Sequence, residues 1–382
     1  MVKRKGLILT GGGARAAYQV GVLKAIAELL PRRASNPFPI ICGTSAGALN
    51  AAVLAVNTRS FRKGVRYLDS IWKSFHANDI YRTDILGVLS NTAQWLAGLL
   101  LSAVGINKLK HTSLLDNSPL KELLEAIMPC EKIQEGIDSG NLHALSITAS
   151  GYGSGESVTF YQGSEEITPW QGTQRIGVKT KIENRHLLAS SALPFFFKPI
   201  QINREYFGDG SMRQIAPISS AIQLGSTSIM VIGVNTAADE KPQDRKNIGA
   251  YPTLARIAGH ALDSLFHDSM EVDLERVKKI NELVNLMQEE TRIRTNLRQV
   301  DVLVITPSQS LEDIAELYVK ELPWTIRLLF RLIGATNQGG SALVSYLLSE
   351  GKYSRKLIEL GYRDAMNRRE EIKQFLELPE AK

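Results

Sequence analysis

The sequence predicts an α/β fold with three layers, in which helices cover both faces of a mostly parallel central sheet, plus a C-terminal helical extension. Two short apolar runs, at residues 6–10 and 38–42, each lead through a glycine-containing turn into a segment with helical spacing. This order of strand, turn and helix is typical of parallel sheets. Two later runs, at residues 228–234 and 300–305, are almost continuously apolar, as buried parallel strands are.

The first strand is followed by a cluster of glycines. After residues 6–10 come Gly11, Gly12, Gly13, Ala14 and Arg15, and then a periodic helix over residues 17–30 that ends before Pro31. Successive glycines at such a junction expose consecutive backbone N–H groups, and a nest of this kind binds phosphate or an oxyanion.

Two other glycine-loop motifs do not fit this cluster. The dinucleotide pattern Gly-x-Gly-x-x-Gly fails because position 16 is Ala16, and no acidic residue stands about 20 positions further on to meet a ribose. The phosphate-binding P-loop pattern fails because no Gly-Lys-Ser/Thr ending is present. An oxyanion hole is therefore the preferred interpretation, with the N–H groups of Gly12, Gly13 and Ala14 as its donors.

The second strand leads into Gly43-Thr44-Ser45-Ala46-Gly47, and a helix-forming segment follows. A serine flanked by glycines between a strand and a helix fits a nucleophile elbow, because glycine removes the Cβ atoms that would collide in the strained turn. The Ser45 hydroxyl would then project from the strand end, above a helix N-terminus that favours negative charge. The alternative is a plain glycine-rich turn.

The two turns belong to one strand, helix, strand unit, so the two strands should be parallel and neighbours. Both turns then open at the same carboxyl edge of the sheet, where ligands of open α/β folds bind. An oxyanion hole beside an exposed serine is an acyl-transfer site. An ordinary α/β-hydrolase is disfavoured, because there several strands precede the elbow and here only one does.

The group that would activate Ser45 is predicted to be an aspartate. Asp209 lies in residues 206–211, where a short strand breaks into a glycine-flanked turn beside aromatic residues. A partly desolvated carboxylate in that position can act as general base without an imidazole. A simple β-turn aspartate is the alternative. None of the six histidines has a comparable setting, although a triad using His260 or His267 keeps the chain order Ser, Asp, His.

These three motifs, in this order, resemble those of the patatin-like phospholipase family, as does the segment at residues 189–197, which ends in three phenylalanines. The resemblance covers roughly residues 5 to 235. It implies a Ser–Asp dyad of Ser45 and Asp209, and an oxyanion hole formed by Gly11, Gly12, Gly13, Ala14 and Arg15. Two departures are Ala16, where the family usually has glycine, and Ser211, where it usually has glycine or alanine. Neither removes a catalytic group.

Given this resemblance, we expect hydrolysis of acyl esters of phospholipids or lysophospholipids through an acyl-enzyme, with no metal or organic cofactor. Arg15 would place positive charge near the oxyanion or the lipid phosphate, and the phenylalanines after Pro194 would form an apolar wall for the acyl chain. Two alternatives stay open. One is an esterase or thioesterase acting on soluble acyl substrates, and the other is a non-catalytic lipid-binding protein.

Composition fits a globular α/β enzyme, with 44% hydrophobic and 22% charged residues. Two cysteines supply no disulfide framework, which fits a reducing compartment. The basic residues at 3–5 lead into the first strand rather than into a targeting peptide, because the apolar run ends at Gly11. A cytoplasmic location is expected. The net charge of +6 suits an anionic lipid surface, and no nucleic-acid recognition motif accompanies it.

No apolar stretch is long enough to span a membrane, but two could lie on the inner face of one. Residues 95–104 are almost uncharged with an aromatic anchor, and residues 324–333 alternate bulky apolar residues with arginines. A core or lid helix is the alternative for both. The predicted organisation is a catalytic domain over residues 1–308 and a helical extension over residues 309–382. That extension could be a lid, an oligomer contact or a membrane arm, and the oligomeric state is open.

Overall fold

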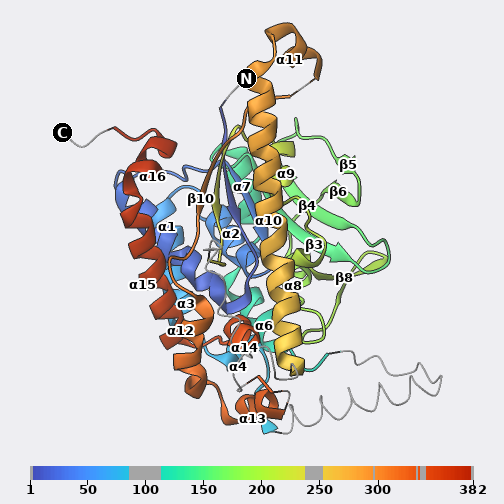
Figure 1. Ribbon diagram of the computed structural model, residues 1–382, viewed down its shortest axis with the longest axis vertical. Helices are drawn as coiled ribbons and strands as arrows, with labels where there is room; N and C mark the ends of the chain where they lie inside the picture. Colours follow the sequence, from blue (N-terminus) through green and yellow to red (C-terminus); the bar gives the residue numbers. More distant parts are fainter. Residues whose placement is uncertain are drawn as a thin grey trace, which may run out of the picture.

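A central sheet of ten strands organises the molecule (Figure 1). The computed structural model describes residues 3–85, 113–236, 253–295, 297–332, 334–335 and 341–379. The strand order is β10-β9-β1-β2-β3-β4-β6-β5, with β8 pairing β3 and β7. The strands are β1 (Lys5–Leu9), β2 (Ile40–Thr44), β3 (Ala144–Gly151), β4 (Ser157–Gly163), β5 (Trp170–Gly172), β6 (Arg175–Lys179), β7 (Ile200–Ile202), β8 (Glu205–Asp209), β9 (Ser228–Ile232) and β10 (Asp301–Ile305).

The five strands from β10 to β3 are all parallel to their neighbours, which confirms the predicted mostly parallel sheet. β1 and β2 are adjacent, as the strand, helix, strand argument requires. Beyond β3 the sheet changes character, because β4 and β8 both pair with β3 in the antiparallel direction. β4 pairs along almost the whole of β3, whereas β8 pairs only with residues 149–151 at its carboxyl-terminal end. β8 therefore reaches the edge at which β2 ends.

Helices cover both faces of the sheet, because the side chains of β1 and β2 alternate between two separate cores. Leu7, Leu9 and Ile41 belong to a large core under α1 and α2, whereas Ile8 and Ile40 belong to a smaller core under α9 and α10. The helices are α1 (Ala17–Leu29), α2 (Ala46–Val56), α3 (Phe61–Ser74), α4 (Ala77–Ile80), α6 (Ser118–Ile127), α7 (Lys132–Asp138), α8 (Asn184–Ser190), α9 (Pro217–Gln223), α10 (Leu254–Leu286), α11 (Glu289–Thr295), α12 (Leu311–Tyr318), α13 (Trp324–Leu332), α14 (Ser341–Leu347), α15 (Gly351–Asn367) and α16 (Arg369–Leu376).

The helices after residue 308 pack against the sheet-covering layer rather than projecting from it (Figure 1). α15 lies along α1 at a distance that only glycine permits. A side chain at Gly21 would collide with the carbonyl oxygen of Ile358, and one at Gly361 would collide with that of Tyr18. Tyr353 and Leu357 are fully buried in the larger core. The division at residue 308 stays a prediction.

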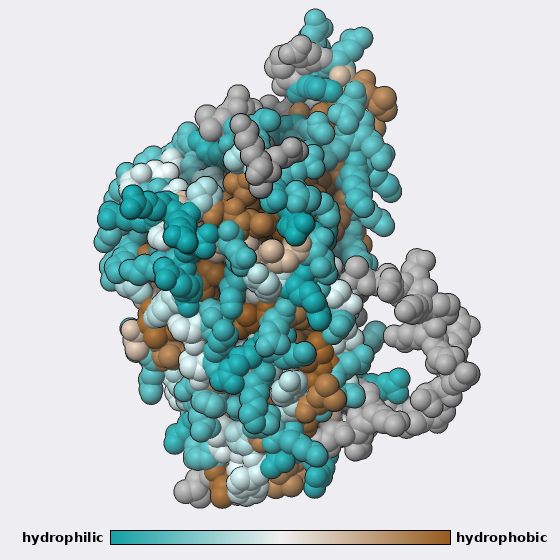
Figure 2. All heavy atoms as spheres, turned by 90° about the vertical axis from the view of Figure 1, so that its left-hand side faces the viewer, coloured by the Kyte–Doolittle hydropathy of each residue, from teal (hydrophilic) through white to brown (hydrophobic). Residues whose placement is uncertain are grey.

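The two predicted surface stretches have different outcomes. Residues 95–104 lie outside the described residues. The stretch at 324–333 contains α13, whose Trp324, Leu328 and Leu332 side chains are exposed. Figure 2 shows a mostly hydrophilic face with separate hydrophobic patches, one of them at the lower end where Figure 1 places α13. Of the helices in the described ranges, none combines the length and the apolar character needed to cross a bilayer.

Candidate active site

Ser45 occupies a sharp turn between β2 and α2. Its backbone has φ of 54° and ψ of −131°, a conformation that L residues rarely adopt and that costs of order 1–3 kcal/mol. The two flanking glycines are needed for close packing. A side chain at Gly43 would meet the backbone of Ala48, and one at Gly47 would meet the carbonyl oxygen of Leu9. The predicted elbow geometry is therefore present, and it holds the Ser45 hydroxyl at the end of β2.

Strand register brings Asp209 to the same point. Thr44 of β2 is aligned with Thr148 of β3, and the next β3 residue, Ala149, is paired with Asp209 at the end of β8. The Ser45 hydroxyl donates a hydrogen bond of 2.5 Å to Oδ2 of Asp209. The other carboxylate oxygen accepts the Ser211 backbone N–H at 2.9 Å. The two side chains that the sequence singled out, 164 positions apart, are thus in direct contact.

The Asp209 carboxylate is almost completely buried, with 1% of its surface exposed. Burial raises its pKa to about 6, and the hydrogen bonds from Ser45 and Ser211 only partly oppose that rise. A carboxylate with this pKa is ionised at neutral pH and is a stronger base than an exposed aspartate. It can therefore accept the proton of a neighbouring hydroxyl without a histidine.

The glycine loop opens onto the same pocket as the serine. Gly11 and Gly12 connect β1 to a 3-10 helix (Gly13–Ala16), whose first amides have no partner within the helix. Gly13 and Ala14 line a narrow pocket together with Ser45. The amide of Arg15 is already used, because it donates to the Gly12 carbonyl oxygen at 3.1 Å. Of the three residues predicted as donors, Gly13 and Ala14 therefore line the pocket beside Ser45, and Gly12 directly precedes them.

The wall of this pocket is largely apolar. The residues that line it, besides the loop and Ser45, come from α2, α3, the α4 region, α6, the segment after α8, and α14: Ala46, Leu49, Trp72, Phe75, Ile80, Tyr81, Leu120, Ser191, Leu193, Phe197, Tyr346, Leu347 and Ser349. Of the three phenylalanines in the resemblance segment, Phe197 lines the pocket, Phe196 is buried in the core, and Phe195 is 69% exposed.

Ser190 is a site residue that the sequence argument did not assign. Its hydroxyl accepts the backbone N–H of Ser45 at 2.9 Å and donates to the Thr148 carbonyl oxygen at 2.6 Å. These two bonds fix the strained elbow to β3. Ser190 lies within the segment at 189–197 that supported the resemblance, but nothing in that segment indicates which serine contacts the elbow.

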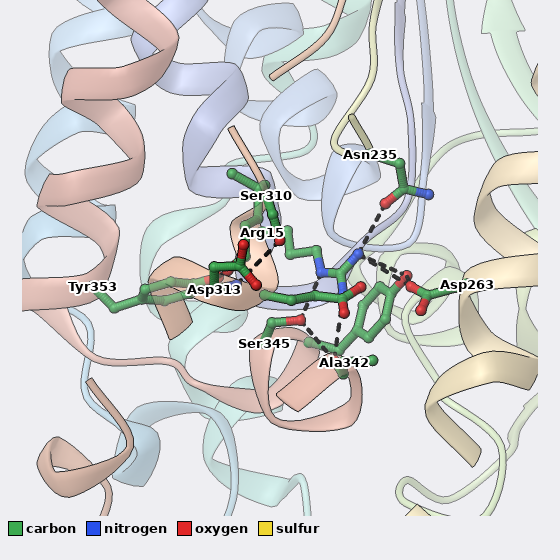
Figure 3. Close-up of polar contacts among 11 residues, drawn as sticks. Arg15, Asn235, Asp263, Ser310, Asp313, Ala342, Ser345 and Tyr353 are labelled. Carbon is green, nitrogen blue, oxygen red and sulfur yellow. Dashed lines mark hydrogen bonds and ion pairs between the residues drawn. The ribbon is translucent and has the colours of Figure 1, made fainter. Parts of the chain in front are cut away.

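The Arg15 side chain lines a separate polar pocket and lies in a polar cluster that Figure 3 shows. It is 2% exposed and forms ion pairs with Asp263 at 3.2 Å and Glu312 at 3.0 Å. Burial opposes its charge, but the Tyr346 hydroxyl and the two carboxylates outweigh burial and raise the Arg15 pKa. We expected the Arg15 charge to lie near the oxyanion or a lipid phosphate. The structure instead pairs the guanidinium with two carboxylates, which already neutralise its charge.

The histidines of the alternative triad lie elsewhere. His260 is exposed on α10 and lines a separate polar pocket with Arg15 and Asp263. His267 also belongs to α10, but its side chain is outside the described set. Among the side chains that the structure describes, no histidine contacts Ser45 or Asp209, and no group of three or more His, Cys, Asp or Glu residues could hold a metal ion.

Comparison with known proteins shows the family to which this chain belongs. The sequence profile of the family described as patatin-like phospholipase matches residues 7–222, more than half of the chain, and the protein belongs to that family. The matched region contains the glycine loop, the serine elbow and Asp209.

Three individual proteins show similarity of different extent. A cGAMP-activated phospholipase of Pseudomonas aeruginosa is 28% identical over 212 residues, covering 55% of this chain and 53% of that protein. The lysophospholipase nte1 of Aspergillus terreus is 54% identical over 50 residues, which is 13% of this chain and 3% of that protein. This chain therefore spans about half the Pseudomonas relative and a small part of the Aspergillus one. The crystal structure of VipD from Legionella pneumophila aligns with 98% of this chain and 67% of its own, at 15% identity and a TM-score of 0.37, too low to support an argument.

Proposed function

We propose that this protein is a serine acyl hydrolase that cleaves ester bonds of phospholipids or lysophospholipids. The observation that carries the proposal is the 2.5 Å hydrogen bond between the Ser45 hydroxyl and the buried Asp209 carboxylate, beside a glycine loop that lines the same pocket. Family membership and the names of the two relatives, a phospholipase and a lysophospholipase, support the lipid ester as substrate.

In the proposed reaction, Oγ of Ser45 attacks the ester carbonyl carbon while Asp209 takes the hydroxyl proton. The carbonyl oxygen becomes negatively charged and accepts hydrogen bonds from the amides of Gly12, Gly13 and Ala14. The carbon–oxygen bond to the alcohol then breaks, and the departing oxygen takes the proton from Asp209. Water attacks the acyl-enzyme and transfers a proton to Asp209, and the Ser45 oxygen recovers that proton as the fatty acid leaves.

The apolar pocket wall supports an acyl chain as the part of the substrate bound beside Ser45. Each methylene buried there contributes about 0.8 kcal/mol, so a fatty acyl group gains far more than a short soluble acyl group. This favours the lipid over the alternative of a soluble ester or thioester.

We also propose that the protein reaches its substrate as a peripheral protein on the anionic inner face of a membrane, through α13. Trp324, Leu328 and Leu332 follow one another at four-residue spacing and are exposed, with Arg331 also exposed on the same helix. This combination suits an interface between acyl chains and anionic headgroups. The Thr325 hydroxyl donates to the carbonyl oxygen of Thr83, two residues beyond the pocket residue Tyr81.

The catalytic proposal is tested with a fluorophosphonate probe and with fatty-acid release from lysophosphatidylcholine and phosphatidylglycerol. We expect labelling and release by the native protein and neither by Ser45→Ala. Ser191→Ala is the matched control, because Ser191 lines the same pocket but its hydroxyl donates only to the carbonyl oxygens of Leu187 and Leu188 in the preceding helix α8. Absence of labelling in the folded native protein would instead favour a lipid-binding protein without activity.

The membrane proposal is tested by sedimentation with phosphatidylglycerol-containing vesicles. Trp324→Ser combined with Leu328→Ser should reduce binding, while hydrolysis of a dispersed short-chain ester stays unchanged. Leu286→Ser is the control, since Leu286 is even more exposed, at 84%, but lies at the far end of α10 (Figure 1). Equal loss of binding in the control and the α13 variant would contradict a role for α13.

A further inference from the structure

The glycine loop is supported from behind by α14. Gly13 has a φ of 54°, and any side chain there would collide with the carbonyl oxygen of Tyr346. Tyr346 and Leu347 also line the pocket that contains Ser45. α14 is therefore both the support beneath the loop amides and part of the pocket wall. The distance between those amides and Ser45 depends on how firmly the loop is attached to this helix.

The side chain of Arg15, which directly follows the three candidate donor residues, attaches the loop to this helix. On α14, its Nε donates to the Ser345 hydroxyl at 2.7 Å and its Nη2 to the Ala342 carbonyl oxygen at 3.4 Å. The guanidinium also lies over the Tyr346 ring, 3.9 Å from the ring centre. Such stacking adds to the hydrogen bonds.

The same guanidinium reaches three further segments (Figure 3). It pairs with Asp263 on α10 and Glu312 on α12, and donates to Oδ1 of Asn235 after β9 at 3.0 Å. The planar fork of arginine can satisfy these separate acceptors at once, which the single ammonium of lysine cannot do. Removing the fork would leave both acids and the Ser345 hydroxyl without their common donor.

We propose that Arg15 is a positioning residue for the oxyanion loop: its buried guanidinium ties the loop to α10, α12 and α14 and so sets where the loop amides lie relative to Ser45. The proposal rests on the proposed hydrolase function. It assigns the chain beyond residue 308 a part in the reaction, because α12 and α14 hold the loop from behind. Arg15 itself does not touch the substrate.

The test compares Arg15→Met, Arg15→Lys and Glu312→Gln with the native protein in steady-state hydrolysis of lysophosphatidylcholine. Arg15→Met should lower kcat by roughly 10²–10³-fold, as loss of an oxyanion-hole donor does, because the amides are no longer held in place. KM should change by less than about threefold, since the acyl pocket still binds the ground state. Arg15→Lys should recover part of the lost kcat.

A second readout separates positioning from general stability. A fatty-acyl trifluoromethyl ketone adds to Oγ of Ser45, its oxygen becomes an anion in the loop, and the serine proton passes to Asp209. Its inhibition constant should rise in parallel with the fall in kcat/KM, whereas the affinity for a non-hydrolysable ether lysolipid should stay unchanged. Destabilisation alone lowers the amount of folded protein and leaves both affinities per folded molecule unaltered.

Arg368→Met is the matched control, because Arg368 pairs with Glu371 on α16 and lies outside the Arg15 cluster. It should keep native kcat and native ketone affinity. If Arg15→Met does not fold, Arg15→Lys and Glu312→Gln carry the test, and a kcat loss with parallel ketone loss supports the proposal.

Two outcomes would contradict different parts of the proposal. Folded Arg15 variants with native kcat and ketone affinity, in a protein whose activity Ser45→Ala abolishes, would overturn the role of Arg15 alone. Activity that survives Ser45→Ala would overturn the proposed function and the Arg15 role with it.

Discussion

The buried charges of Asp209 and Arg15, on the two sides of the glycine loop, differ in how far neighbouring groups compensate them. On the pocket side, Asp209 receives hydrogen bonds from Ser45 and Ser211 but no cation in the described part of the chain, so burial raises its pKa to about 6. On the other side, Arg15 is surrounded by partners that outweigh its burial and raise its pKa. The carboxylate that we propose as the proton acceptor is left incompletely compensated, whereas the arginine that we propose positions the loop is fully paired.

The sharpest test of this contrast is Asp209→Asn, which keeps the shape and removes the charge. Hydrolysis should fall by roughly 10²–10⁴-fold, the usual contribution of a general base. Stability should rise at pH 8, by as much as about 3 kcal/mol, because the native state no longer holds an ionised carboxylate in a dry site. Thermal unfolding at pH 8 with parallel kinetics measures both effects. A variant that is inactive and also less stable would mean that the Asp209 charge is compensated as well as that of Arg15.

The sign of that stability change follows from the direction of the pKa shift. The folded-state pKa of Asp209, about 6, is above the ordinary value of 3.8, so the native state binds the proton more tightly than the unfolded state does. The contribution of this group to stability is therefore largest at low pH and is lost as the pH rises through about 6. Asp209→Asn should remove this part of the pH dependence.

The pH dependence of kcat/KM tests the same carboxylate in the active protein. Proton acceptance requires ionised Asp209, so kcat/KM should fall about tenfold for each pH unit below 6 and level off above it. The measurement uses an uncharged short-chain ester between pH 4 and 8. An inflection near 4 instead of 6 would show that Asp209 is no more basic than an exposed aspartate.

Filling the pocket should change which acyl chains are accepted. Leu49→Phe adds bulk to the wall contributed by α2, and each methylene that no longer fits should cost about 0.8 kcal/mol, or roughly fourfold in kcat/KM. The chain-length profile should therefore move toward shorter acyl groups, while the rate for the shortest ester is retained. A uniform loss at all lengths would mean that the acyl chain does not enter this pocket.

The smallest effect is expected on the Arg15 side. The Tyr346 hydroxyl donates to Oδ1 of Asp263 at 2.7 Å and accepts from Arg15 at 3.2 Å, so Tyr346→Phe removes one neutral member of a well-paired cluster. We expect a loss of stability of about 1 kcal/mol and little change in the pH profile, because the ring still lies beneath the guanidinium. Denaturant unfolding checks the first part. A pH profile displaced by this variant would show that the two sides of the loop are electrostatically linked.

The proposed dyad and the glycine loop could be located in the sequence because their signals are local. Glycines around Ser45 and at positions 11 to 13 satisfy steric demands of the turns in which they lie, and a strand that breaks into a turn marks Asp209. The parallel arrangement of β1 and β2 follows from the length of the connection between them. The contact between Ser45 and Asp209 depends on the pairing of β8 with β3, which no local sequence pattern predicts. Only the resemblance to a known family linked the three motifs.

The contacts that could not be predicted join residues far apart in the sequence. Ser190 bonds to an amide 145 positions away, and Arg15 to a hydroxyl 330 positions away. Helical periodicity after residue 308 indicates helices but not their partners. α15 packs on α1 through Gly21 and Gly361, and this packing places α14, which directly precedes α15. In that place α14 contributes Tyr346 and Leu347 to the pocket wall.

The contribution of α14 has a consequence for synthesis. Both proposed reactive residues leave the ribosome well before Leu347 does, so a growing polypeptide carries the nucleophile for much of its translation without a finished cavity around it. A ribosome stalled anywhere before this point would release a product that has the dyad in its sequence and no closed wall in which to use it.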